Sequence, residues 1–267
     1  MSKRALSIGV CALAVLALSG PTRAARPVIL PSHCLHRHTE PAVATCLRPT
    51  FRRAAATGRV EAALDALEQA VRRGRLDDCH ALAHELAHVV VARVHRVDRA
   101  LALGGTQCSD GYQHGIVEAA AGVGAGPRTC ARRGSEDLRD ACHHALGHRY
   151  LIEKRYDVRG ALARCRSRLH GRAAELCFGG VMMENSMQFM RLGSALYTLH
   201  APYACDGLHL SGRLRETCYE EVGEVAMFVF RHRLNAARRV CARVASAYGR
   251  RACNAGARAE LELSRSG

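Results

Sequence analysis

The spacing of the cysteines constrains the fold of this chain more than any other feature of its sequence. Beyond the N-terminal segment, four pairs of cysteines lie 12 residues apart and one pair lies 13 apart, which leaves Cys79 and Cys108 as a sixth pair. An even number of cysteines is typical of a disulfide framework in an exported protein, although spacing alone does not exclude other pairings. The disulfides that we expect are Cys34–Cys46, Cys79–Cys108, Cys130–Cys142, Cys165–Cys177, Cys205–Cys218 and Cys241–Cys253.

The same cysteines also recur with a period along the chain. Positions 46, 79, 108, 142, 177, 218 and 253, here called the repeat cysteines, follow one another in steps of 29 to 41 residues. A period near 34 residues is typical of stacked helical hairpins, each of which packs on its neighbours. We predict an all-α, disulfide-stapled α-solenoid of about six or seven hairpins. One helix would open at each repeat cysteine, and terminal units without histidine would act as caps.

The composition agrees with a helical fold. Aromatic residues make up only 4% of the chain and Trp is absent, whereas β-sheets favour aromatic and β-branched side chains. Residues 60–72 have apolar side chains at helical spacing, and residues 121–128 and 201–213 are rich in Gly or Pro and predict loops. No boundary divides residues 25–267, which we expect to form a single helical-repeat domain.

The N-terminal segment predicts export. Residues 1–24 combine Lys3 and Arg4 with an apolar run and a small residue at the cleavage position, as in a secretory signal peptide. The run is about 14 residues long, whereas a transmembrane helix needs roughly 20. We therefore expect a periplasmic or extracellular protein with no transmembrane segment once the signal peptide is removed.

The chain is strongly basic, with a formal net charge of +15 at pH 7. Nearly all of its positive side chains are Arg, which binds phosphate and carboxylate through paired N–H donors. An anionic ligand or a partner protein is therefore a candidate partner, and the alternative is an ordinary solvated surface. No nucleic-acid-binding motif is present, and a hydrophobic content of 48% excludes an intrinsically disordered chain.

Histidines and glutamates occupy matching positions in consecutive repeats. His84, His114 and His148 follow their repeat cysteines by five or six residues, and Glu184 follows by seven in the next unit. Stacked hairpins bring equivalent positions to one side of the array, so we expect these side chains to share a groove. Imidazole and carboxylate suit a divalent transition metal, with Zn favoured and Fe or Cu as alternatives. The predicted ligands are His84, His88, His114, His148 and Glu184.

One short segment resembles the active helix of zincin metallopeptidases. His84-Glu85-Leu86-Ala87-His88 fits their H-E-x-x-H pattern. The resemblance implies that His84 and His88 bind zinc and that Glu85 acts as the base. Glu118 or His114 would supply a third ligand, and Glu118 is also a candidate base. Zincin domains usually set this helix against a β-sheet, whereas we expect no strands here.

A longer stretch, roughly residues 79–190, resembles a group of uncharacterised exported bacterial Cys/His-rich helical-repeat proteins. The motifs that carry this resemblance are CHALAHE, GYQHGIVE, CHHALGH and CFGGVMMEN. The resemblance supports the location of the site and implies no reaction. The matching positions are His80, His84, Glu85, His114, Glu118, His143, His148, Glu184 and Asn185.

The sequence leaves two functions open. The first is a metal-dependent enzyme, foremost a hydrolase, with the zincin-like peptidase as a minor variant. The second is a non-catalytic repeat module that binds a partner protein or an anionic ligand, with structural histidines. Near-stoichiometric metal in the folded protein would favour the first.

Overall fold

The computed structural model describes residues 27–37, 40–120, 126–190 and 194–266. These residues form fifteen helices and no strand, so the prediction of an all-α fold is confirmed. None of the helices in these ranges is both long and apolar enough to cross a membrane. The expected signal peptide, residues 1–24, lies outside the described residues.

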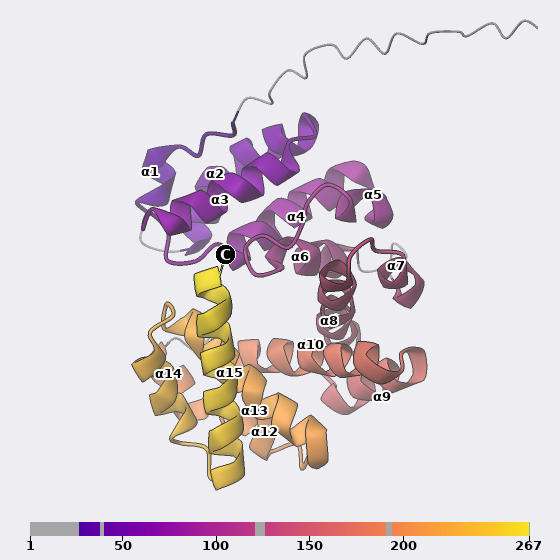
Figure 1. The fold of residues 1–267 in the computed structure, drawn as a ribbon, viewed down its shortest axis with the longest axis vertical. Helices are drawn as coiled ribbons and strands as arrows, with labels where there is room; N and C mark the ends of the chain where they lie inside the picture. Colours follow the sequence, from indigo (N-terminus) through magenta and orange to yellow (C-terminus); the bar gives the residue numbers. More distant parts are fainter. Residues whose placement is uncertain (1–26, 38–39, 121–125, 191–193, 267) are drawn as a thin grey trace, which may run out of the picture.

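Seven helices stack on one another in the order of the sequence and are here called the stacked helices (Figure 1). A shorter helix precedes each of them and flanks the stack, and two such helices precede α13. Helix pairs therefore recur roughly every 35 residues. The stacked helices are α2 (Glu40–Ala56), α4 (His80–Val94), α6 (Gly111–Ala119), α8 (Glu136–Glu153), α10 (Gly171–Met190), α13 (Gly212–Val229) and α15 (Ala247–Ser266). The flanking helices are α1 (Ser32–Leu35), α3 (Val60–Arg72), α5 (Val97–Leu101), α7 (Pro127–Ala131), α9 (Val158–Arg168), α11 (Ser194–His200), α12 (Tyr203–Asp206) and α14 (Leu234–Cys241).

All six disulfides have the predicted pairing. Five of them join a flanking helix to the stacked helix that follows it, and Cys79–Cys108 joins the starts of α4 and α6. A narrow array buries little core per residue, so each disulfide contributes about 2–4 kcal/mol to its stability. Six disulfides are typical of a chain in an oxidising, extracytoplasmic environment.

The helix starts differ from the prediction. Helix α4 begins directly after Cys79, but α2, α8, α10, α13 and α15 each begin six residues before their repeat cysteine. Local signals set these starts: Ser135 accepts a hydrogen bond from the amide of Leu138 at the start of α8, and α10 begins at Gly171 with a positive φ of 53°. The cysteine therefore lies in the second helical turn, beside the flanking helix to which it is bonded.

Residues 60–72 form α3 as predicted, with Val60, Leu64 and Leu67 buried on one face. The predicted loops are more helical than expected. Helix α12 interrupts residues 201–213, and α7 begins at Pro127, a favoured residue for the first turn of a helix. Residues 121–125 lie outside the described residues.

The stack curls so that its last units approach its first. The guanidinium of Arg231 lies 3.1 Å from the carboxylate of Asp77, just before α4. The ring of Phe228 in α13 lies 5.3 Å from that of His80 in α4. In Figure 1 the C-terminal end of α15 (yellow) lies beside the chain that leads into α4. The curl places residues of α3 and α4 and residues of α13 and α15 around one cleft.

Candidate metal centre

A glycine lets two stacked helices approach closely where the histidines lie. Gly115 of α6 packs against α4, and a Cβ at this position would lie 2.7 Å from the Cα of His84 and 2.8 Å from the Cβ of Ala87. Both distances are well below van der Waals contact, so only glycine allows this approach. The short distance between the helices brings imidazoles from α4 and α6 together.

His80, His84 and His114 form a three-imidazole cluster. Each offers a ring nitrogen that lies within 4.8 Å of the nitrogens offered by the other two. Nε2 of His80 lies 3.1 Å from Nε2 of His84, and the ring of His114 lies 5.3 Å from that of His80. Nitrogen ligands about 2.0–2.1 Å from a tetrahedral zinc ion are roughly 3.3 Å apart. Small side-chain rotations therefore bring the cluster to the geometry of a metal site.

Two histidines of this cluster, His80 and His114, favour the neutral, metal-binding form. Burial, reinforced by His84, lowers the pKa of His80 to about 3. Burial, reinforced by His144, also lowers the pKa of His114 well below its usual value. Nδ1 of His114 is buried and has no hydrogen-bond partner. Neutral imidazoles have a free lone pair, which is what a transition metal binds.

Glu118, His148 and Glu184 form a second group, the Glu–His–Glu cluster, from α6, α8 and α10. Their ligand atoms also lie within 4.8 Å of one another. Nδ1 of His148 lies 3.3 Å from Oε1 of Glu118 and 3.3 Å from Oε2 of Glu184. The side chain of His148 is only 1% exposed, so these interactions take place in a site nearly free of water.

Without a metal, the Glu–His–Glu cluster is a buried network of ion pairs. Burial lowers the pKa of His148, but hydrogen bonds to Glu118 and Glu184 outweigh it and raise the pKa to about 9. Burial raises the pKa of Glu118, but His84 and His148 outweigh it and hold that pKa well below its usual value. His148 is therefore protonated and Glu118 ionised at neutral pH.

Glu118 links the two clusters. Its Oε2 lies 3.1 Å from Nδ1 of His84, while its Oε1 faces His148. When His84 binds a metal through Nε2, its Nδ1–H donates to Glu118. A carboxylate in this position commonly fixes the orientation of a metal-binding histidine.

An open cleft of about 780 Å³ lies beside the three-imidazole cluster. His80, His114 and His144 line it, and most of its charged side chains are carboxylates. Its one arginine, Arg172, is paired with Asp140 at 2.5 Å. The cleft therefore favours cations over anions although the whole chain is basic. The carboxylates are Glu68, Asp110, Asp137, Asp140, Glu224 and Glu260.

The structure brings five of the predicted site residues into these clusters and leaves two outside. His84 and His114 lie in the three-imidazole cluster, and Glu118, His148 and Glu184 lie in the Glu–His–Glu cluster. His88 and Glu85 line a separate surface pocket with Arg48 and Arg52. Oε2 of Glu85 lies 3.1 Å from the guanidinium of Arg48.

His84 thus lies in a cluster with His80, one turn before it, and His88 lies outside that cluster. A step of four residues turns a helix by about 40° and moves about 6 Å along its axis. His80 thus lies near His114 at the start of α6, whereas His88 is exposed one turn beyond. His80 shares the histidine stripe of α4, and that stripe was the sequence signal for it.

Three titratable groups in the last two units were not predicted from the sequence: the buried Glu221 and Glu260 and the partly buried His232. Glu260 is 3% exposed, and its Oε1 lies 3.1 Å from Nε2 of His232. Glu260 follows Cys253 by seven residues, the same offset as Glu184 after Cys177, so the repeat register would have found it. The last unit therefore continues the row of titratable groups, although its helix α15 carries no histidine.

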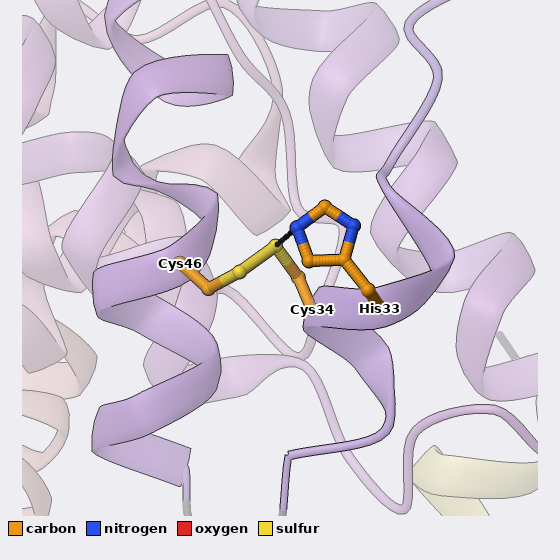
Figure 2. Close-up of side chains that lie close together, drawn as sticks. All are labelled: His33, Cys34 and Cys46. Atoms are coloured by element: carbon orange, nitrogen blue, oxygen red, sulfur yellow. Dashed lines mark hydrogen bonds between the residues drawn. A yellow bond between two sulfur atoms is a disulfide. The ribbon is translucent and has the colours of Figure 1, made fainter.

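A third group of metal-binding residue types lies at the N-terminal end of the described chain. Nε2 of His33 lies 3.6 Å from Sγ of Cys34, which is bonded to Cys46 (Figure 2). Metals bind the thiolate form of cysteine, and a disulfide sulfur is not a thiolate. This group does not compete with the two clusters in the oxidised protein.

No protein-family model, curated protein or solved structure matches this chain. The chemistry of the site therefore rests on its own geometry. That geometry shows buried His and Glu groups that can hold a metal.

Proposed function

We propose that this is an exported protein that binds a divalent transition metal ion in its three-imidazole cluster. One observation supports this most directly: nitrogens of His80, His84 and His114 converge within 4.8 Å in a buried site. The six disulfides support export to an oxidising compartment. The resemblance to exported bacterial Cys/His-rich repeat proteins is consistent with the same location.

The donor set favours zinc. Three imidazoles with no thiolate suit Zn, and Fe or Cu can bind similar ligands. Every cysteine among the described residues is in a disulfide. Sulfur ligation is therefore not part of the proposal.

The cleft favours catalysis over a purely structural role. Structural zinc sites are closed by four protein ligands, whereas catalytic sites have three and leave one position open. His80 and His114 line the open cleft, so a substrate can reach the site. Zinc supplies Lewis acidity, and we propose hydrolysis as the class of reaction.

Asp110 is the carboxylate best suited to accept a proton in this cleft. Burial, with Asp137 and Asp140 nearby, raises its pKa to about 7, close to the pH at which a general base works best. It lies one turn before His114 and lines the same cleft. Of the bases proposed from sequence, Glu85 is paired with Arg48 outside the cluster and Glu118 is held by two histidines.

Elemental analysis of oxidised protein purified without a polyhistidine tag tests the proposal. We expect bound metal after loading with Zn²⁺ and dialysis, and its loss in His84→Ala and His114→Ala. His88→Ala is the matched control, because His88 is on the same helix but exposed, and should retain the metal. Protein that binds no zinc, or His88→Ala behaving like His84→Ala, would refute the proposed site.

The alternative is a non-catalytic module with structural histidines. The ion pairs of the Glu–His–Glu cluster favour it, because they satisfy these buried groups without a metal. Hydrolysis of generic ester and peptide substrates, measured with and without a chelator, separates the two functions. Asp110→Asn should reduce a genuine hydrolytic rate without releasing the metal.

A further inference from the structure

We propose that the Glu–His–Glu cluster binds a second divalent ion, so that the protein holds two metals joined through Glu118. This inference deepens the proposed function and rests on it, because Glu118 joins the second cluster to His84 of the first.

The donor atoms converge from three consecutive stacked helices. Oε1 of Glu118, Nδ1 of His148 and Oε2 of Glu184 face one another, with the imidazole nitrogen 3.3 Å from each oxygen. One nitrogen and two carboxylate oxygens match the ligand preferences of Zn, Fe or Mn. Two negative charges also compensate a divalent ion in a buried site.

Each carboxylate has its other oxygen held in place. Oε1 of Glu184 accepts hydrogen bonds from Nε2 of Gln188 at 3.0 Å and from the hydroxyl of Tyr156 at 3.4 Å. Oε2 of Glu118 is held by Nδ1 of His84 at 3.1 Å. In each carboxylate, a neighbouring side chain thus holds one oxygen, and the other oxygen faces the position proposed for the ion. Carboxylates that bind metals in proteins are commonly held by hydrogen bonds in this way.

The two metal positions are connected by a chain of direct interactions. His84 uses Nε2 in the first cluster and Nδ1 toward Glu118, and Glu118 uses its second oxygen in the other cluster. An ion held by Glu118 therefore fixes the carboxylate that orients His84. The second ion acts as a positioning element for the first site.

The number of zinc or cobalt ions bound per chain tests the inference. Oxidised, metal-free protein is titrated with Zn²⁺ and separately with Co²⁺, dialysed, and assayed by elemental analysis and by the visible absorption of Co²⁺. We expect two ions in the unmodified protein and one in Glu184→Gln, with the first site retained. Glu224→Gln is the matched control, because it changes a buried carboxylate outside both clusters, and should still bind two ions.

The outcomes separate this inference from the proposed function. If the unmodified protein binds one ion, and this ion is lost in His84→Ala but retained in Glu184→Gln, the second site is overturned and the first site stands. His148 then keeps its proton in the folded protein. One ion lost in Glu184→Gln and retained in His84→Ala overturns the three-imidazole site. No bound ion overturns both. The number of ions bound per chain by the unmodified protein decides whether a second site exists, even if a variant fails to fold. Circular dichroism and disulfide mapping check that each variant is folded.

Discussion

Nδ1 of His84 lies 3.1 Å from Oε2 of Glu118, although the two residues are 34 positions apart in the sequence. That separation is one repeat, so the interaction joins equivalent faces of neighbouring units. It couples the three-imidazole cluster to the Glu–His–Glu cluster. The repeat thus provides the candidate metal centre both with imidazoles that could bind a metal and with a carboxylate that orients one of them.

Replacing Gly115 with alanine should destabilise the protein and weaken metal binding together. The added Cβ would collide with the backbone of His84, and such overpacking costs roughly 1–3 kcal/mol. Urea unfolding under oxidising conditions measures the loss of stability, and zinc titration measures the loss of affinity. Gly134→Ala is the control, because a Cβ there meets nothing within 4 Å. Equal behaviour of the two variants would contradict the close approach of α4 and α6.

Zinc should raise the melting temperature of the protein in proportion to the logarithm of its concentration. An ion that binds only the folded state stabilises it by about 2.7 kcal/mol at 100 times its dissociation constant. His84→Ala should lose most of this shift, and excess chelator should abolish it in the unmodified protein. A melting temperature that is independent of zinc would contradict a metal centre in the folded chain.

Glu224 should contribute stability to the metal-free protein that is lost as the pH rises from about 4.5 to about 8. Burial, with Glu260 and Glu220 nearby, raises the pKa of Glu224 from 4.5 to about 8, so this carboxyl group binds more protons in the folded state than in the unfolded state in this window. Glu224→Gln removes this group and should remove its contribution from the curve of unfolding free energy against pH. Glu216→Gln, on the same helix but more exposed, should leave the curve unchanged. An unaltered slope in Glu224→Gln would show that Glu224 ionises normally in the folded state.

Removing one disulfide should destabilise the array without changing the other five. The double variant Cys165→Ser with Cys177→Ser should lose about 2–4 kcal/mol of unfolding free energy. This bond joins α9 to α10, which carries Glu184, so the variant should also bind the second ion more weakly. Removal of Cys34–Cys46, far along the chain from both clusters, serves as the comparison. Equal loss of metal in both variants would point to general unfolding.

The fold was predictable because the cysteines recur along the chain with the period of the helical repeat. Their pairing, the all-α class and the extent of α3 follow from spacing and from the apolar pattern of residues 60–72. The helix starts did not follow, because capping residues such as Ser135 set them independently of the cysteines. Spacing along a chain fixes the period of a repeat but not its phase.

The site was predictable only in part, because ligand geometry depends on how closely the helices approach. Matching repeat positions brought His84 and His114 together and grouped His148 with Glu184. The H-E-x-x-H pattern indicated His88, whereas the packing of Gly115 against α4 selects His80. The sequence of one helix indicates which histidines share a face of it. The packing of the neighbouring helix determines which turn of that face lies in contact.

The ion pair between Arg231 and Asp77 gives this array a property that most repeat proteins lack. Open solenoids tolerate the gain or loss of a unit, because each unit contacts only those beside it. Here a unit inserted or deleted between Asp77 and Arg231 would separate the two residues and pull apart the walls of the cleft. Duplicating a unit in this part of the chain should therefore abolish the cleft while leaving each hairpin intact.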